Sequence, residues 1–254
     1  MRTVKAIAYN NYLEAIRDKI LYVFVAFAIL LIASSLILGS ISLDQDIKIV
    51  KDFGLAGIFF FGVLIAVFVG ANSIYKEKEK RTIYTILPKP IKHWEFILGK
   101  FLGLCLTLAV TTSLMTIALV IVSLIKEHTF QLLLLQAILF EYMELILLVS
   151  VVLAFSSFTS PISAAIYTIC LFAIGHSTSI IYQLASKSGS VVLSKTLMGV
   201  YYIFPNLEKF NLKTNVVFGI GLSGQEIIFT IIYALFYIAL MLILATLILR
   251  KQEF

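Results

Sequence analysis

Residues 101–125 read FLGLCLTLAVTTSLMTIALVIVSLI, a run of 25 residues without a charged side chain. A helix needs about 20 predominantly apolar residues to cross the hydrocarbon core of a membrane. The apolar residues here are continuous and do not alternate with polar ones, which favours a helix over a strand of a membrane barrel. This stretch therefore predicts a membrane-spanning helix.

The same composition continues through the rest of the chain. Hydrophobic residues make up 61% of the 254 residues and charged residues 13%, and the mean hydropathy is +1.03. A soluble chain of this length could not bury so much apolar surface. We predict an all-α, polytopic membrane protein with six transmembrane helices in a single transmembrane domain, residues 1–254. The expected spans cover approximately residues 20–40, 54–75, 101–125, 131–157, 161–184 and 227–249.

The lysine and arginine residues are distributed unevenly between the two sides that these spans create. Thirteen of the 20 fall in the N-terminal segment, in residues 76–100 and at the C-terminus. Because positive residues are enriched on the cytoplasmic side, both termini and the 76–100 connector are predicted to be cytoplasmic. The net charge of +6 is thus a topology signal, and no basic soluble module indicates a nucleic-acid partner.

Two segments outside the spans also carry helical patterns. Apolar residues recur at helical spacing through residues 1–19, which predicts a helix lying in the membrane interface. The outer connector, about residues 186–225, is rich in apolar residues over 191–204. That composition favours short re-entrant or interface-lying helices rather than a free loop.

The most charged break between two spans is residues 76–100, which read KEKEKRTIYTILPKPIKHWEFILGK. Residues 76–81 alternate in charge and extend the second span into water. Residues 82–87 are half apolar and form one short helical turn, which Pro88 and Pro90 end. We expect a short helix held at the cytoplasmic surface; the alternative is a solvated turn with anchoring lysines.

This connector also has the order of residues found in a family signature: acidic residues, a Thr, a Leu pair, a Pro-Ile step, an aromatic residue and a Gly-Lys pair. The corresponding positions are Glu77, Glu79, Thr82, Ile86-Leu87, Pro90-Ile91, Trp94 and Gly99-Lys100. In this order the chain resembles the ABC-2 type transporter permeases. It departs from the signature at Arg81, where many members have Gly, and at Ile86 within the Leu pair.

Weaker features elsewhere follow the same family in order. They are the serine-rich turn before Pro161, Gly175-His176, Phe204-Pro205-Asn206-Leu207-Glu208 and Leu249-Arg250-Lys251. Together they resemble the branch of permeases associated with the maturation of multicopper enzymes.

The resemblance implies a function and a set of partners. It implies a permease subunit of an ATP-binding-cassette exporter in the bacterial inner membrane, paired with a second permease, the same or different, and with cytoplasmic ABC ATPases. ATP and Mg²⁺ would bind the partner ATPase, with no cofactor on this chain. The 82–87 turn would be the coupling helix. The implied coupling residues are Glu77, Glu79, Arg81, Thr82, Ile83, Ile86, Leu87 and Pro90.

Polar and small residues inside the spans are further candidates. Glu141 and Glu144 lie one helical turn apart in the fourth span. Buried carboxylates in a membrane are costly, so they mark either a functional path or a hydrogen-bonded structural role. Gly99 and Gly103 form a small-xxx-small step, which favours close helix packing. No residues at metal-ligand spacing accompany His176, which predicts no metal site.

Two other classes of function compete with the permease. A stand-alone secondary carrier or channel would use Glu141 and Glu144 as its ion site. An intramembrane hydrolase would use Ser223 within Gly221-Leu222-Ser223-Gly224, but a base for that serine is missing downstream. The chain lacks a P-loop, because Phe101 follows the only Gly-Lys pair where the motif needs Ser or Thr. We therefore expect a transport subunit and not an enzyme.

Overall fold

The computed structural model describes residues 2–41, 46–79, 92–127, 132–213, 215, 221 and 223–251. All the regular structure within these residues is helical. The elements are α1 (Arg2–Ile16), α2 (Lys19–Ile41), α3 (Asp46–Glu79), α5 (His93–Glu127), α6 (Leu132–Ser156), α7 (Pro161–His176), α8 (Thr178–Lys187), α9 (Val191–Ile203), the 3-10 turn η1 (Leu207–Phe210) and α11 (Gly224–Lys251).

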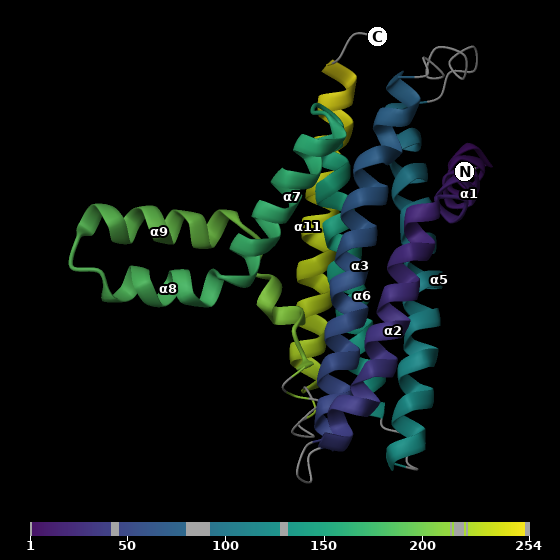
Figure 1. The fold of residues 1–254 in the computed structure, drawn as a ribbon. Helices are drawn as coiled ribbons and strands as arrows, with labels where there is room; N and C mark the ends of the chain where they lie inside the picture. Colours follow the sequence, from purple (N-terminus) through teal and green to yellow (C-terminus); the bar gives the residue numbers. More distant parts are fainter. Residues whose placement is uncertain are drawn as a thin grey trace.

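Five of these helices are long and apolar enough to cross a membrane: α2, α3, α5, α6 and α11. They run side by side, as Figure 1 shows, with α6 the most deeply buried of them. Glycines let α3 approach α6 closely. A Cβ atom at Gly62 would lie 2.6 Å from Leu145, and one at Gly70 would lie 2.5 Å from Val152. Contact between small residues is a common way for membrane helices to pack.

The fifth expected span, residues 161–184, is a broken helix. Ser160 caps α7 by accepting a hydrogen bond from the Ser163 amide, and Pro161 occupies the first helical turn, where its missing N–H costs nothing. After Ser177 the chain bends by 58° into α8. The helices α7 and α8 are long enough to cross a membrane only if the two are counted together as one bent span.

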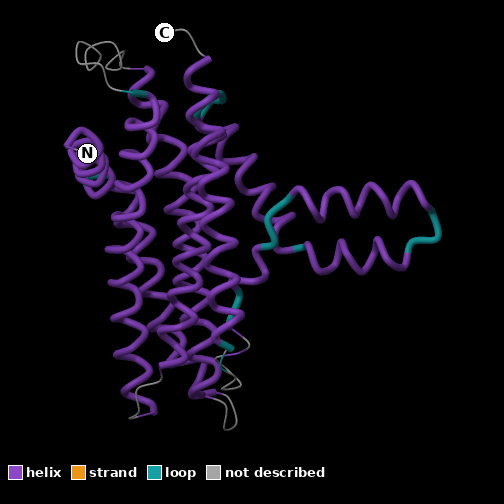
Figure 2. Tube along the Cα trace, turned by 180° about the vertical axis from the view of Figure 1, so that it is seen from behind, coloured by secondary structure: helices purple, strands orange, loops and turns teal. Residues whose placement is uncertain are grey.

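The hairpin of α8 and α9 leaves the bundle sideways at about half its height, as Figures 1 and 2 show from opposite sides. The short turn η1, which follows α9, packs on α6, α7 and α8. Charged residues of the 207–213 segment therefore lie part-way along the bundle and not at its end. Non-helical backbone at membrane depth is tolerated only where protein or water covers it.

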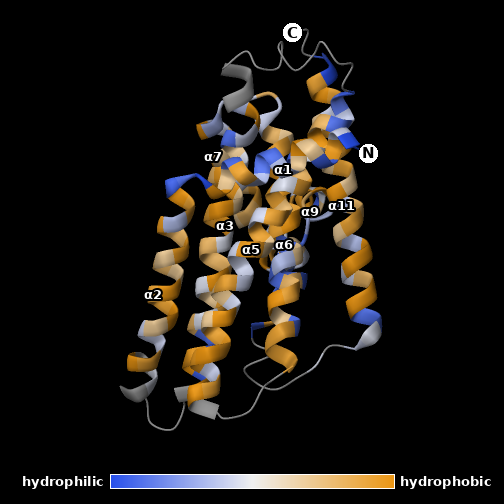
Figure 3. Cartoon of the chain, turned by 90° about the vertical axis from the view of Figure 1, so that its right-hand side faces the viewer, coloured by the Kyte–Doolittle hydropathy of each residue, from blue (hydrophilic) through white to orange (hydrophobic). Residues whose placement is uncertain are grey.

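Both termini lie toward one end of the bundle, and α1 crosses that end, seen nearly along its axis in Figure 1. Figure 3 shows apolar residues along most of the length of the long helices. Large side chains such as Phe27, Leu139 and Phe236 are exposed on the outside of the bundle, as lipid-facing residues must be. The predicted all-α, polytopic membrane fold is confirmed.

Candidate functional site

The expected coupling residues lie between α3 and α5. Glu77 and Glu79 belong to the last turns of α3, so the helix continues past the apolar span as the charge pattern predicts. Arg81, Thr82, Ile83, Ile86, Leu87 and Pro90 lie outside the described residues. The next described residue is Lys92, which directly precedes α5.

The small-xxx-small step on α5 packs against α1. A Cβ atom on Gly99 would lie 2.6 Å from Ile7, and one on Gly103 would lie 2.6 Å from the Ala8 carbonyl oxygen. The partner of this step is therefore the N-terminal helix and not another membrane span. Any side chain at Gly103 would push α1 away from α5, because the obstructing atom belongs to the backbone.

A buried polar group, which we call the Asn11 cluster, consists of Asn11, Ser73 and Lys100. The Asn11 side-chain oxygen accepts hydrogen bonds from Ser73 Oγ at 2.9 Å and from Lys100 Nζ at 3.1 Å. Its side-chain nitrogen donates to the Lys100 carbonyl at 3.2 Å. One amide thus joins α1, α3 and α5, and Lys100 is only 1% exposed.

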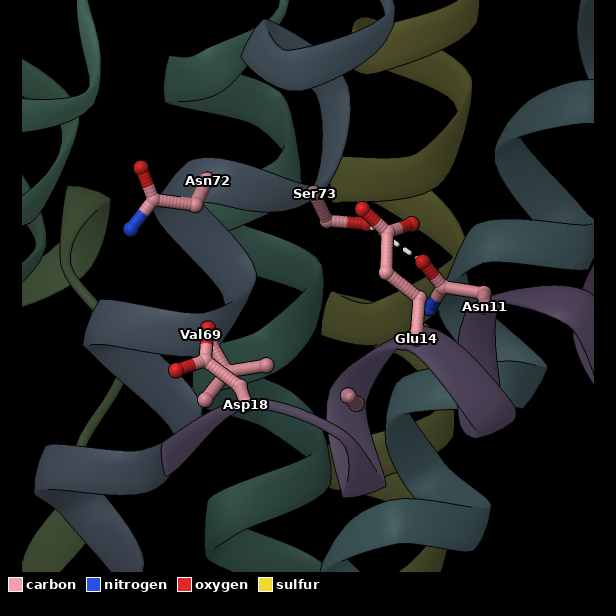
Figure 4. A pocket seen from close by; sticks show the side chains of 7 residues that line it. Asn11, Glu14, Asp18, Val69, Asn72 and Ser73 are labelled. Carbon is pink, nitrogen blue, oxygen red and sulfur yellow. Dashed lines mark hydrogen bonds between the residues drawn. The ribbon is translucent and has the colours of Figure 1, made fainter. Parts of the chain in front are cut away.

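Figure 4 shows the hollow beside this cluster. Its lining includes two members of the cluster itself and combines polar and apolar residues of α1 and α3 with Asp18, which follows α1; the residues from the two helices are Asn11, Glu14, Ala15, Val69, Asn72 and Ser73. Its volume is about 10 Å³, which is about the space of one water molecule. The hydrogen bonds of Asn11 to α3 and α5 make the Asn11 cluster a joint between helices.

A second polar group, which we call the His176 cluster, consists of Glu141, Glu144, His176, Glu208 and Lys213 and links distant segments. His176 Nε2 is 2.7 Å from Glu144 Oε1, and its Nδ1 is 3.2 Å from Glu208 Oε2. The side chain of Glu144 is 1% exposed, that of His176 is 22% exposed and that of Glu208 is 44% exposed. The imidazole therefore bridges a buried carboxylate on α6 and an exposed one on η1.

Aromatic rings fix the imidazole in place. The ring centroid of Phe172 is 4.6 Å from that of His176 and the centroid of Phe59 is 5.8 Å away, both in edge-to-face arrangements. Lys213 Nζ lies 4.6 Å above the Phe59 ring and acts electrostatically on both buried glutamates. The cluster therefore contains a resident positive charge held partly by a cation–π contact.

The remaining glutamate, Glu141, has an unusual environment for a carboxylate. It is 2% exposed, and neither carboxylate oxygen has a hydrogen-bond partner among the described residues. An unpaired buried carboxylate costs several kcal/mol, on the order of the penalty for burying one charge in a protein. Such a group persists when it serves a function or when it binds a positive charge or proton.

An apolar hollow, open to the outside of the bundle, lies on another face of α6. Side chains of α6, η1 and α11 line it, with Leu135, Phe140, Phe210 and Ile227 among them. Its volume is about 850 Å³, within the range of about 300–1,000 Å³ that is usual for ligand sites.

The family model described as ABC-2 family transporter protein matches residues 4–254 of the chain. The chain belongs to the ABC-2 transporter family. No curated protein matches it. The permease is therefore a multi-pass transport protein of the ABC class rather than an enzyme.

Ser223 of the permease has a structural partner. Ser223 N–H and Oγ–H both donate to Glu226 Oε2 at 2.9 Å, and the Glu226 amide returns a bond to Ser223 Oγ. This is a capping box that starts α11. Both ring nitrogens of His176 contact carboxylates instead, so these two residues do not form the nucleophile–base pair of a hydrolase.

No three His, Cys, Asp or Glu residues in the described part of the permease are placed to hold a metal ion. Sequence reasoning missed Asn11 and Ser73, and it missed Glu208 as the partner of His176. His176 and Glu208 are separated by 32 residues and a whole hairpin, so no local pattern could connect them. The signal that could have pointed to Ser73 is its position as a polar residue within an expected membrane span.

Proposed function

We propose that this permease is the membrane subunit of an ATP-driven exporter, powered by a separate cytoplasmic ATPase. The observation that carries the proposal is the family match over residues 4–254. The proposal places both termini in the cytoplasm of a bacterial cell and the protein in the inner membrane. The Lys and Arg bias toward the side of the termini supports this orientation.

The proposed coupling route begins at residues 82–87, where the ATPase would dock. Ile83, Ile86 and Leu87 would enter a groove on its surface, and Glu77, Glu79 and Arg81 would meet polar groups at the rim. The connector is attached at one end to α3 and at the other to α5. Because the Asn11 cluster ties both helices to α1, a push on the connector would move the three helices together.

The proposed assembly contains a second permease subunit. Glu208 is exposed although it belongs to η1, which packs against the membrane helices α6 and α7, and hydrocarbon cannot cover a carboxylate. A partner subunit or a water-filled path between two subunits would cover it. The permeases would then rock against each other as ATP is hydrolysed, which is a rigid-body transition of a common kind.

We assign the substrate path to the faces of α6. The His176 cluster would supply its polar wall, with Glu141 and Glu144 as pathway residues, and the apolar hollow of about 850 Å³ would supply an apolar contact surface.

The test is the double substitution Ile83→Asp and Leu87→Asp. Two charges on the docking face should abolish co-purification of the ATPase or uncouple ATP hydrolysis from transport. Insertion of the permease should not change, because neither residue is in a span. Thr85→Asp is the matched control, since it adds a charge in the same segment at a position not assigned to the contact. A double variant that keeps its ATPase and full coupled transport would contradict the proposal.

A stand-alone carrier is the second candidate, and the intramembrane carboxylates at Glu141 and Glu144 are the observation that favours it. It predicts transport driven by an ion gradient with no ATPase present. Purification in a mild detergent separates the two candidates, because only the ABC permease should bring a P-loop ATPase with it.

A further inference from the structure

The contacts of His176 form an ordered series from an exposed acid to a buried one. Glu208 is the exposed member, His176 is intermediate, and Glu144 is buried, with contacts of 3.2 Å and 2.7 Å between them. Both contacts are within hydrogen-bonding distance, and each uses a different ring nitrogen. A histidine bonded in this way can accept a proton at one nitrogen and release one at the other.

Glu141 lies one turn before Glu144 on α6 and lacks any hydrogen-bond partner among the described residues. It is sealed from solvent, so no bulky ligand has room at its oxygens. The smallest species that can neutralise it without a cavity is a proton.

The charges that face His176 lead to the same ligand. Glu144 of α6 and Glu208 of η1 contact the ring, and Glu141 lies one turn from Glu144 on the same helix. Lys213 is the nearby cation, and it lies over the Phe59 ring of α3, which packs on the imidazole. Lys209 lies over Tyr233 of α11, at 4.4 Å from the ring. With His176 neutral, the three carboxylates and Lys213 together carry two negative charges. Protons bound to the carboxyl groups lower this charge toward neutrality, the condition that a buried site in a membrane protein favours.

We propose that Glu208, His176 and Glu144 form a relay that carries a proton from water to the buried carboxyl group of Glu141. In each transfer His176 Nδ1 takes a proton from the Glu208 carboxyl group. Nε2–H then gives its proton to Glu144 Oε1. One proton enters and one leaves, and the imidazole is left as its other tautomer. Glu144 and Glu141 lie one turn apart on α6 but share no hydrogen bond in this structure, so the last transfer requires a side-chain rotation that brings the two carboxyl groups together. Exchange of tautomers then resets the ring.

Glu141 is therefore a proton-binding site inside the membrane, and His176 is the positioning and transfer residue that connects it to water. The aromatic rings of Phe59 and Phe172 hold the imidazole between the two acids and keep water from its faces. This inference goes beyond the proposed coupling to an ATPase and does not depend on it. Failure of the docking test would leave the relay intact, and the converse also holds.

The experiment uses the purified full chain in lipid nanodiscs, with the proton as the probe. The pH is jumped from about 8 to about 4, across the range where His and Glu side chains ordinarily titrate. Time-resolved infrared absorption of protonated carboxyl groups follows the arrival of protons. The wild-type signal assigned to Glu141 should be absent in Glu141→Gln and present in Glu226→Gln, which removes an exposed acid outside the cluster.

His176→Ala should slow the rise of that signal by at least about tenfold, since a positioned proton-transfer group accelerates such steps by 10²–10⁴. Imidazole added to the buffer should restore the rate in His176→Ala, because it can occupy the space that the ring leaves. A merely structural histidine would not give this rescue. Glu208→Gln should also slow the rise, while Glu226→Gln should match the wild type.

If His176→Ala fails to fold, His176→Gln provides the same test of slowing, with no rescue expected because the space stays filled. An equal rate in wild type and in the folded histidine variant would overturn the relay. So would a slow His176→Ala rate that imidazole leaves unchanged, or a carboxyl signal that survives in Glu141→Gln.

Discussion

The Asn11 cluster and the His176 cluster are both polar groups buried in an apolar bundle, but their chemistry differs. In the Asn11 cluster both the oxygen and the nitrogen of the amide have partners, and the cluster joins α1, α3 and α5. The His176 cluster is built from titratable groups, reaches solvent at Glu208 and leaves both oxygens of Glu141 without a partner among the residues that the structure describes. One cluster is closed and satisfied, whereas the other is open and incomplete.

This difference separates stability from function. A fully bonded polar network rigidifies the helices that share it, because every broken bond leaves a buried group unpaired. A network with one unsatisfied acid sacrifices stability and retains the capacity to bind charge. We therefore expect substitutions in the first cluster to lower stability most, and substitutions in the second to change activity while stability is kept.

The largest loss of stability should follow Lys100→Met. Methionine has similar volume but cannot donate to Asn11, and a buried charged hydrogen-bonding group is costly to remove. We expect the free energy of unfolding to fall by about 3 kcal/mol. Thermal unfolding in detergent measures it, with Lys92→Met as the control at an exposed lysine next to the same helix. Equal melting temperatures for the two variants would show that the Asn11 cluster does not stabilise the packing of α1, α3 and α5.

An intermediate loss should follow Gly103→Ala, because the new Cβ would meet the Ala8 carbonyl and α1 would have to move. Overpacking of this kind costs about 1–3 kcal/mol. Gly199→Ala is the control, since nothing lies within 4 Å of its Cβ position, and a helical alanine there should stabilise by up to about 1 kcal/mol. Opposite signs in thermal unfolding are expected; a loss of similar size in both variants would show that α1 does not pack on this step.

The smallest change in stability should follow the joint change of Glu141 and Glu144 to Gln. The shapes are kept and two buried charges are removed, so we expect a shift below about 1 kcal/mol. ATP hydrolysis and transport by the assembled complex should nevertheless fall strongly, whereas Glu226→Gln should leave both unchanged. Normal transport by a normally expressed double variant would make the two glutamates structural.

Composition and periodicity predicted the class of fold and the approximate position of the long helices. The 101–125 stretch lies within α5, and the apolar length needed to cross a membrane leaves little freedom there. The bend after Ser177 was not predicted, although Gly175-His176-Ser177-Thr178-Ser179 interrupts the apolar residues of 161–184 at that point. Length and hydropathy report how much apolar chain is present and not whether it runs straight.

The candidate sites were predicted in part. Glu141 and Glu144 are visible in the sequence because charge is rare in a membrane span, and Gly99 and Gly103 are visible because their spacing matches a packing motif. Their partners were not visible. Contact between Glu144 and His176, or between Gly103 and α1, depends on how helices distant in the sequence pack, and one sequence does not reveal that packing.

The central claim is that an ATPase drives this permease from the side where the connector and the termini lie. Cysteine-accessibility labelling in intact cells tests it most directly, in a background lacking Cys105 and Cys170. A cysteine at position 92, before α5, should react only when reagent reaches the cytoplasm. A cysteine at position 226 lies in the first turn of α11, at the end of that helix opposite the C-terminus, and should react from outside. Labelling of position 92 from outside would place the connector beyond the reach of any cytoplasmic ATPase and would contradict the account.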